Sequence, residues 1–310
     1  MFKIFIDGSA GTTGLRIYER LEERDDIKLL KISEEDRKNL EIRKQAVCEA
    51  DAAFLCLPDA AAAEIVCALE GEKVRILDTS TAHRTNPEWA YGFPELSNNH
   101  KQKIVSSNKT AVPGCHASGF VALVYPLVAC GLMPKDYPAS CFSLTGYSGG
   151  GKKMIAEYES NERNSELASP RQYGLLQKHK HLPEMKKITG LEFEPFFSPV
   201  VGDFYSGMTV TVPLFPKLLN KKVSAEDVQE IFAKHYEDAT AVKVLPFGFD
   251  GFLGTNNLSG KDGMEIIVSG NDERILIASR FDNLGKGSSG AAVQCMNLML
   301  GADEKKGLAL

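Results

Sequence analysis

Residues 2–14, FKIFIDGSAGTTG, hold the pattern that decides the fold of the first part of the chain. FKIFID is a short apolar run typical of a buried β-strand, and the glycine-rich segment GSAGTTG follows it directly. The next segment, LRIYERLEE, has apolar side chains at helical spacing with charged residues between them. A strand, a glycine-rich turn and a helix in this order indicate a dinucleotide-binding domain.

The segment GSAGTTG predicts contact with the pyrophosphate of a dinucleotide. Glycines let the backbone turn tightly and approach the phosphates, which bind the exposed amides of the helix start. The spacing is GxxGxxG where GxGxxG is more common, and its position after the first strand supports the same role. The alternative interpretation is a tight turn without a ligand. The predicted cofactor-binding residues are Gly8, Ser9, Gly11, Thr12, Thr13 and Gly14.

A second predicted strand, IKLLKIS, ends at Ser33, close to the position that distinguishes NAD from NADP. Glu34 and Glu35 are suited to hold a ribose hydroxyl, whereas Ser33, Arg37 and Lys38 are suited to hold a 2′-phosphate. The same charges also fit a solvated loop. These residues favour NADP only slightly, with Ser33 and Arg37 as its expected contacts.

Strands and helices continue to alternate along the first third of the chain. AAFLCLP (52–58) is typical of a buried parallel strand, DAAAAEIVCALEG (59–71) of a helix and VRILDTS (74–80) of a further strand. This alternation predicts a doubly wound α/β sheet. Pro58 and Ser80 end two of the strands at the edge where ligands bind in such sheets, and we expect both to contact the cofactor.

The composition limits the domain count, the partners and the compartment. A length of 310 residues predicts two domains. A net charge of −5 gives no general attraction for nucleic acid or an anionic membrane, and no apolar run reaches membrane-spanning length. The seven cysteines show neither disulfide-framework nor zinc-site spacing, which predicts a reduced, cytoplasmic protein without a metal. Three of them are expected to pack in the first domain's core: Cys48, Cys56 and Cys67.

Residues 112–120, VPGCHASGF, place Cys115 at the start of an apolar helix, directly behind a Pro-Gly turn. Unsatisfied amides and the positive end of the helix dipole stabilise a thiolate there. Taken alone, the pattern fits a buried structural cysteine as well as a nucleophile. The nucleotide motif and a histidine pair further along the chain favour the nucleophile. His116 is not expected to be its base, because neighbouring residues on a helix point about 100° apart.

Residues 178–184, KHKHLPE, contain the candidates for a general acid/base. A histidine oriented by a carboxylate is the usual form of this group. His181, three positions before Glu184, is the first candidate and His179 is the alternative, while a solvated basic loop is the other interpretation of the segment. No third ligand of matching type lies nearby to form a metal site. The histidines without such neighbours are expected at the surface: His83, His100 and His235.

Two further segments are suited to bind an anion. TGYSGGGKK (145–153) combines small residues, a hydroxyl and two lysines, so Ser148, Gly149 and Lys152 are candidates. Arg84, in DTSTAHR, follows a strand and is suited to hold a carboxylate or phosphate bidentately. A thiolate, an acid/base and a nicotinamide cofactor together predict attack on an acyl group followed by hydride reduction of the thioester. An acyl phosphate fits both anion sites.

With these residues assembled, the chain resembles the N-acetyl-gamma-glutamyl-phosphate reductase family, in the shorter of its two types. The resemblance covers nearly the whole length and rests on GSAGTTG, DTSTAHR with YGFPELS, VPGCHASG, TGYSGGGK, HKHLPE and DNLGKGSSGAAVQCMNLMLG. It implies NADP as cofactor, Cys115 as nucleophile and His181 as acid/base. It also implies that Asn283 to Gly290, Asn283 and Gly287 among them, contribute to the cofactor site.

The resemblance further implies a Rossmann domain over residues 1–115, with a C-terminal helix over 285–310 packing back on it. Residues 116–284 are then an α+β substrate and dimerisation domain in a homodimer or homotetramer. The segment 196–215 alternates as strands do, and 224–238 predicts a helix capped by Ser224. The implied reaction is the NADPH-dependent reduction of N-acetyl-L-glutamyl 5-phosphate to N-acetyl-L-glutamate 5-semialdehyde and phosphate, in arginine biosynthesis.

Two alternatives stay open from the residues. One is an aspartate-semialdehyde dehydrogenase-like reductase that acts on a different acyl phosphate. The other is an NADP-binding redox sensor without turnover, with Cys115 as the sensing thiol.

Overall fold

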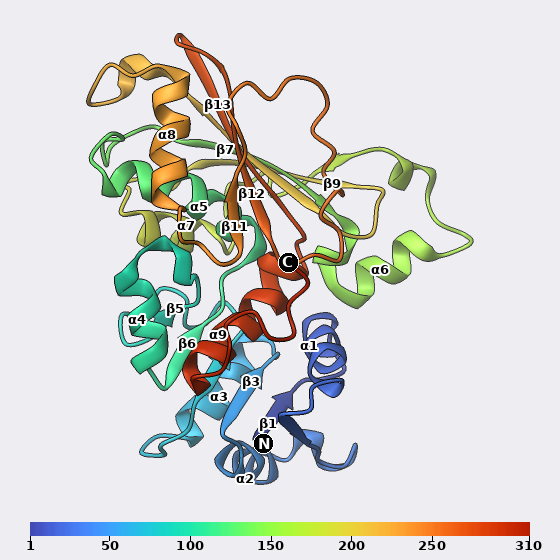
Figure 1. Ribbon diagram of the computed structural model, residues 1–310. Helices are drawn as coiled ribbons and strands as arrows, with labels where there is room; N and C mark the ends of the chain where they lie inside the picture. Colours follow the sequence, from blue (N-terminus) through green and yellow to red (C-terminus); the bar gives the residue numbers. More distant parts are fainter. The chain divides into compact units, whose positions relative to one another are not determined.

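The computed structural model describes the whole chain, residues 1–310, as two compact units (Figure 1). The first unit comprises Met1–Gly114 and Ser288–Leu308, and the second comprises Cys115–Gly287 and the last two residues. The chain therefore enters the second unit at Cys115 itself. None of the helices is both long and apolar enough to span a membrane.

The first unit is built on a six-stranded sheet with the strand order β2-β1-β3-β4-β6-β5, in which every strand pair is parallel. The carboxyl ends of these strands therefore meet at one edge, where the loops after β1, β3 and β4 begin. The strands are β1 (Phe2–Asp7), β2 (Ile27–Leu30), β3 (Ala52–Leu55), β4 (Ile76–Asp78), β5 (Ala90–Tyr91) and β6 (Lys109–Ala111).

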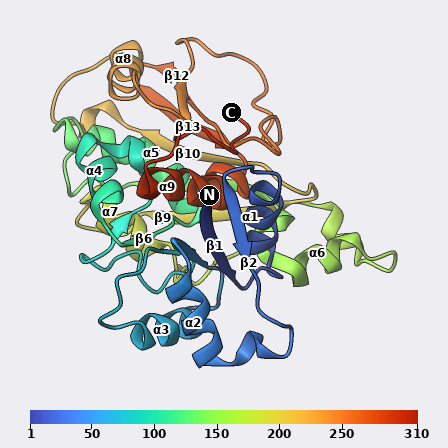
Figure 2. The ribbon, with the colours of Figure 1, turned by 60° about the horizontal axis from the view of Figure 1, so that its bottom comes forward.

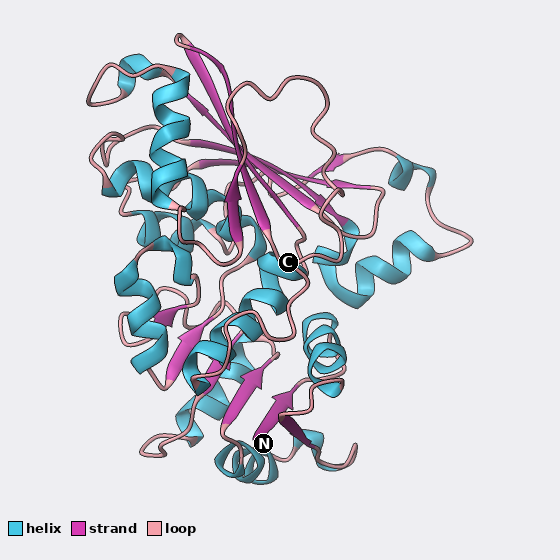
Figure 3. Ribbon diagram, viewed as in Figure 1, coloured by secondary structure: helices cyan, strands magenta, loops and turns pink.

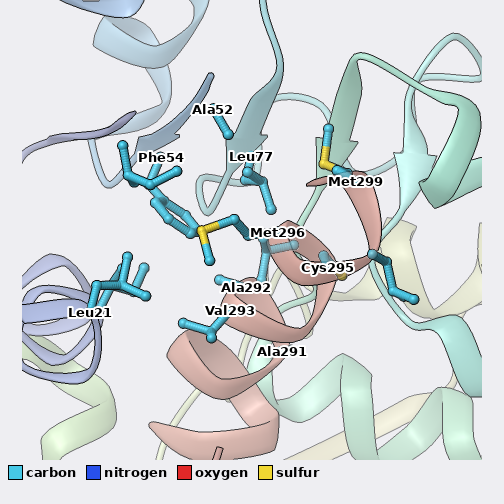
Figure 4. Close-up of a cluster of buried hydrophobic side chains, with 14 of the residues drawn as sticks. Leu21, Ala52, Phe54, Leu77, Ala291, Ala292, Val293, Cys295, Met296 and Met299 are labelled. Atoms are coloured by element: carbon cyan, nitrogen blue, oxygen red, sulfur yellow. The ribbon is translucent and has the colours of Figure 1, made fainter. Parts of the chain in front are cut away.

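Helices cover both faces of this sheet, as the predicted doubly wound fold requires. On one face α1, α4 and α9 share a core with the strands, and Figure 4 shows Met296 of α9 against Phe54 of β3. On the other face α2 and α3 contribute Val47 and Ile65 to a second core (Figure 2). The helices are α1 (Thr12–Glu22), α2 (Leu40–Glu49), α3 (Asp59–Ala68), α4 (Asn98–Ser106) and α9 (Gly290–Leu300).

Two details of this unit differ from the sequence-based expectations. Cys48 on α2 and Cys67 on α3 are exposed, because residues such as Val47 occupy the buried faces of those helices, whereas Cys56 is half-buried and packs against the core as expected. The helix expected over 285–310 is limited to α9, because Gly301 adopts a left-handed conformation that ends it. A π-helical turn, Gly285–Ser289, precedes α9, and turns follow it.

The second unit contains a mixed seven-stranded sheet with the order β11-β12-β13-β10-β7-β9-β8. Its pairs β7–β9 and β11–β12 are parallel and the others are antiparallel. This is the α+β second domain that the sequence predicted. The strands are β7 (Ser140–Gly146), β8 (Arg171–Gln172), β9 (Phe196–Gly202), β10 (Met208–Leu214), β11 (Val242–Val244), β12 (Met264–Asn271) and β13 (Arg274–Phe281).

Helices α5, α7 and α8 lie on one side of this sheet (Figure 3). The start of α5 rests directly on the strands: a Cβ on Gly119 would lie 2.4 Å from the Val210 side chain, and Ser279 Oγ donates to the Gly119 carbonyl at 3.2 Å. The N-cap predicted at Ser224 is present, and Asp227 completes a capping box with it. The helices are α5 (Cys115–Ala129), α6 (Gly151–Glu159), α7 (Leu182–Thr189) and α8 (Ala225–His235).

The opposite face of the seven-stranded sheet carries exposed apolar side chains. Phe142, Phe196 and Leu276 are 49%, 63% and 45% exposed. The strand register places all three on the same face, because side chains alternate along a strand. Such an apolar surface is suited to contact with another protein.

Candidate active site

The glycine-rich loop of the first unit has a backbone that only glycine fits at two positions. Gly8 has φ +85°, and a Cβ there would lie 2.3 Å from the carbonyl oxygen of Cys56. A Cβ on Gly14 would lie 2.4 Å from the carbonyl oxygen of Gly8. Gly11 is the N-cap of α1 and brings no capping side chain to the first-turn amides. These amides are therefore available to a phosphate group, as the loop's sequence predicted.

A pocket of about 410 Å³ lies beside this loop, within the first unit. Its lining includes Gly8 and Ser9 of the loop together with Ser33 and Arg37. Ser33 Oγ donates to an Asp36 carboxylate oxygen at 2.6 Å, and Arg37 forms an ion pair with Glu34 at 2.8 Å. The pocket has the size of an ordinary small-molecule site, and the loop and pocket together fit a dinucleotide.

Thr13, Pro58 and Ser80 lie outside this pocket lining. Thr13 Oγ1 lies 3.1 Å from Ser288 Oγ, so the loop contacts the segment before α9 in the same unit. Pro58 is the N-cap of α3. Ser80 donates through both its amide and its hydroxyl to the Asp78 carboxylate, at 2.9 and 2.7 Å. Their contact with a cofactor stays a prediction.

The surface position expected for His83 is wrong. Its Nδ1 lies 2.6 Å from the fully buried Asp78 carboxylate, and its ring stacks on Trp89 with centroids 4.2 Å apart. The loop after β4 folds back on itself, which brings His83 to a carboxylate five positions earlier. His100 and His235 are half-buried.

Arg84 is buried in the same loop. Its guanidinium donates through Nε to the Val112 carbonyl at 2.9 Å and through Nη2 to the Thr79 carbonyl at 2.8 Å. These contacts give Arg84 a structural role inside the first unit, where it holds the strand end that leads into Pro113. Its predicted contact with a substrate anion stays a prediction.

Cys115 is the first residue of α5 and is half-buried. The π-helical turn approaches it closely at Gly287, where a Cβ would lie 3.0 Å from the Cys115 Cβ and 3.1 Å from the Phe281 ring. The predicted cofactor-site residue Gly287 is therefore the residue whose missing side chain makes room for Cys115. Lys286, which sequence reasoning did not single out, is 1% exposed in the same turn.

Replacing Gly287 by Ala is expected to displace Cys115 while the unit stays folded. The added methyl group overpacks a buried contact, which typically costs about 1–3 kcal/mol of stability. We expect turnover to fall about tenfold, because reacting groups misplaced by about 1 Å lose rate steeply. Steady-state kinetics and thermal unfolding measure the two effects. Unchanged turnover in a destabilised variant would show that the position of Cys115 tolerates this contact.

Three imidazole rings gather in the second unit, one of them from the residue that follows Cys115. The ring of His116, the residue after Cys115 on α5, lies 5.5 Å from the ring of His179 and 5.6 Å from that of His181. The rings of His179 and His181 are 4.7 Å apart. Phe197 packs against this cluster from β9, within 5.2 Å of His116. The structure thus brings both candidate bases to the ring of His116, the residue that follows the predicted nucleophile in the chain.

Burial makes two of these imidazoles neutral. It lowers the pKa of His116 to about 3, with His179 adding to the effect. It also lowers the pKa of His179 to about 4, with the charge of Lys180 adding to the effect. Nδ1 of His179 accepts a hydrogen bond from the backbone N–H of His181 at 3.2 Å. His179 is thus a neutral ring with its Nε2 carrying the proton.

His181 and Glu184 lie within one helical turn, as their spacing predicted. His181 is the N-cap residue of α7 and is 5% exposed, and Glu184, in the first turn, is 1% exposed. A buried histidine and a buried carboxylate at this spacing are suited to proton transfer. The hypothesis of a solvated basic loop is wrong for His181, although Lys178 and Lys180 are exposed.

Two partners of the cluster escaped the sequence analysis. His116 Nδ1 lies 2.7 Å from Ser143 Oγ on β7, and His116 Nε2 lies 2.7 Å from the Tyr173 hydroxyl. These residues are 27 and 57 positions away in the chain, so no local motif marks them. The one available signal was that Ser143 occupies an inward position of an alternating strand.

The predicted anion loop and the final segment meet in the second unit. Asn283 Nδ2 donates to Ser148 Oγ at 3.0 Å, and Asn283 Oδ1 accepts from the Gly207 amide at 2.9 Å. A Cβ on Gly149 would lie 3.5 Å from Asn283 Nδ2. Lys152 is exposed in the first turn of α6. Ser148, Gly149 and Asn283 thus form one cluster, and Lys152 follows Gly149 by three residues in the sequence.

Family models match both units. Residues 3–104 match the semialdehyde dehydrogenase NAD-binding domain, and residues 115–283 match the semialdehyde dehydrogenase dimerisation domain. The first unit therefore binds a nicotinamide dinucleotide, and the second belongs to a domain type that mediates oligomerisation.

Full-length relatives and solved structures agree with these matches. The chain is 46% identical over 306 residues to an N-acetyl-gamma-glutamyl-phosphate reductase from Brucella ovis, covering 96% of this chain and 99% of the relative. A reductase of the same name from Brucella anthropi is 47% identical, with 96% and 98% covered. Among solved structures, aspartate semialdehyde dehydrogenase II from Vibrio cholerae has a TM-score of 0.74 at 18% identity, with 97% and 98% covered. This last similarity shows a shared fold.

Proposed function

The chain belongs to the N-acetyl-gamma-glutamyl-phosphate reductase family, and on this premise we propose that it reduces N-acetyl-L-glutamyl 5-phosphate to N-acetyl-L-glutamate 5-semialdehyde. Inorganic phosphate is the second product, and the reaction is a step of arginine biosynthesis. The observation that supports the proposal most is Cys115 at the start of α5, directly before His116 of the imidazole cluster, in a chain that also contains a nicotinamide-dinucleotide domain.

Cys115 is the proposed nucleophile. His181 takes the thiol proton and the thiolate adds to the acyl carbon. Phosphate then leaves with its bonding electrons and takes up that proton from His181, which leaves a thioester on the sulfur. The nicotinamide cofactor, when bound, supplies the hydride that reduces this thioester. Collapse of the resulting adduct releases the aldehyde and returns the sulfur as a thiolate. Glu184 keeps the His181 ring oriented, and His179 contacts the substrate through its Nε2–H.

The proposed cofactor is NADP. The glycine loop (Gly8, Gly11 and Gly14) would hold the pyrophosphate on the first-turn amides of α1. Ser33 and Arg37 line the adjoining pocket and would hold the 2′-phosphate. In the second unit the resemblance assigns Asn283 to the cofactor site, and Ser148 and Gly149, which lie against Asn283, are further candidates for it.

The remaining proposals concern the assembly, the compartment and the substrate's charges. The apolar face with Phe142, Phe196 and Leu276 would pair with a second copy of the chain, giving a homodimer or a homotetramer. All seven cysteines are free, in agreement with a reducing cytoplasm. Arg84 and Lys152 remain the candidate contacts for the substrate's carboxylate and phosphate.

An assay in the reverse direction tests the proposed substrate. N-acetyl-L-glutamate 5-semialdehyde with inorganic phosphate should reduce NADP, and omission of phosphate should stop the reaction. Aspartate semialdehyde should give little activity, because its acyl chain is shorter and lacks the N-acetyl group. Replacing NADP by NAD in the same assay tests the cofactor. Preference for aspartate semialdehyde would favour the rival dehydrogenase, and no turnover with either aldehyde would favour the redox sensor.

A further inference from the structure

A hydrogen-bonded chain of three side chains in the second unit has at its centre His116, the residue that follows Cys115 on α5. Ser143 on β7 contacts Nδ1 of His116, and Nε2 of His116 contacts the Tyr173 hydroxyl, both at 2.7 Å. Ser143 is fully buried, His116 is 3% exposed and Tyr173 is half-buried, so the two hydrogen bonds of His116 are largely shielded from water. None of the roles assigned so far uses Ser143 or Tyr173.

The direction of these hydrogen bonds follows from the protons available. Burial lowers the pKa of His116 to about 3, so its ring carries one proton at neutral pH. The Ser143 hydroxyl, fully buried, has His116 Nδ1 as its hydrogen-bond partner, so its proton goes to Nδ1. The imidazole proton then lies on Nε2 and is donated to the Tyr173 oxygen. This leaves the hydroxyl proton of Tyr173 for another acceptor.

We propose that Tyr173 is a catalytic residue that donates its hydroxyl proton in a hydrogen bond to the acyl oxygen of the substrate carried on Cys115, with His116 and Ser143 as its positioning residues. This inference rests on the proposed role of Cys115 as nucleophile. Tyrosine hydroxyls are among the side-chain donors that stabilise the oxyanion of acyl-transfer reactions.

The surroundings of Tyr173 support this role. Burial raises the pKa of the Tyr173 hydroxyl, and the negative charge of the Cys115 thiolate raises it further, so the hydroxyl stays protonated. His116 holds the hydroxyl from α5, the element that Cys115 begins. The other titratable groups beside the cluster are His179 and His181, whose rings lie near His116, and Lys180, whose charge acts on His179; Glu184 lies in the first turn of α7, after His181.

The step conserves atoms and charge. When the thiolate adds to the acyl carbon, the C–S bond forms and the carbonyl electron pair moves to the oxygen, which becomes an oxyanion. Tyr173 donates a hydrogen bond to this oxygen and keeps its proton. When the leaving group departs with its bonding electrons, the C=O bond reforms and the hydrogen bond weakens. Tyr173 therefore acts where negative charge develops on a carbonyl oxygen. It contributes nothing to a displacement at a saturated carbon, where no oxyanion forms.

Two electrophiles that react with the same sulfur separate this role from a structural one. p-Nitrophenyl acetate acylates a thiolate through an oxyanion and releases p-nitrophenolate, whereas iodoacetamide alkylates it by direct displacement of iodide. We expect Tyr173→Phe to slow acylation of Cys115 at least tenfold, since one oxyanion donor is worth about 10²- to 10³-fold in known cases. Alkylation should stay within about twofold of the wild type. Cys115→Ser identifies the reacting sulfur.

Ser143→Ala and Tyr147→Phe complete the design. Without Ser143, the His116 proton is free to sit on Nδ1, Tyr173 then donates to Nε2, and acylation should slow while alkylation does not. Tyr147, whose hydroxyl contacts the exposed Glu159, is the matched control and should change neither rate. Equal rates of acylation in Tyr173→Phe and wild type overturn the inference, and so does a parallel loss of both reactions. If Cys115 of the wild type reacts with neither reagent, the proposed nucleophile itself is overturned. If the two reagents give the expected rates but the enzyme does not turn over the N-acetylglutamyl substrate, only the substrate assignment is overturned.

Discussion

The variant Cys115→Ser is expected to lose reduction of the acyl phosphate by at least about 10³-fold while it still binds the dinucleotide. A serine hydroxyl is far harder to ionise than a thiol, and removing a nucleophile from a covalent mechanism leaves only the contribution of binding. The substitution leaves Cβ in place, so the close approach of Gly287 to residue 115 is kept. Steady-state turnover and a fluorescence titration with NADP measure the two properties separately.

Cys130→Ser is the matched control for this experiment. Cys130 lies in the same unit, directly after α5, and is exposed. Its replacement should leave turnover unchanged within about twofold, because surface substitutions away from special features have small effects. A covalent acyl adduct found by mass spectrometry on the wild type and absent from Cys115→Ser would support the thioester directly. An active Cys115→Ser enzyme would rule the covalent route out.

The first unit could be predicted largely from local sequence patterns. The apolar run before Gly8, the glycines and the helical spacing after them are contiguous, and contiguous residues determine a strand, its turn and its helix. The exposure of Cys48 and Cys67 was mispredicted, because a local pattern identifies a helix better than it identifies the buried side of that helix. A nearly uniform apolar pattern, such as that of α3, does not show which side of a helix faces the core.

The site of the second unit depends on contacts that no local pattern encodes. Ser143 and Tyr173 meet His116 only after the mixed sheet has aligned β7 with its neighbours, so their role depends on topology. His83 shows the same limit, since its carboxylate partner Asp78 lies five positions earlier in a loop whose path the sequence does not specify. The roles of Cys115 and the histidine pair stay predictions, which rest on residue type and spacing together with the nucleotide motif and the family resemblance.

The variant His181→Asn is expected to lower turnover about 10²- to 10⁴-fold, whereas His179→Asn should lower it less than about tenfold. An acid/base group contributes this much when it transfers the proton, and a substrate contact contributes less. His179 is poorly suited to the transfer, because burial and the charge of Lys180 lower its pKa to about 4 and its Nδ1 already accepts the His181 amide. His181 shares its helical turn with the buried Glu184.

The comparison needs a readout that separates proton transfer from packing, because the two rings lie only 4.7 Å apart. Thermal unfolding of both variants should agree closely if the asparagine side chains fill the cluster equally. The pH dependence of turnover should then lose one limb in His181→Asn and keep its shape in His179→Asn, since only the acid/base group leaves its ionisation in the profile. Equal losses of turnover with unchanged pH profiles would show that the two imidazoles act together as packing around Cys115. A larger loss of turnover in His179→Asn would instead assign the acid/base role to His179. Its ring would then have to become less buried when substrate binds, so that its pKa rises.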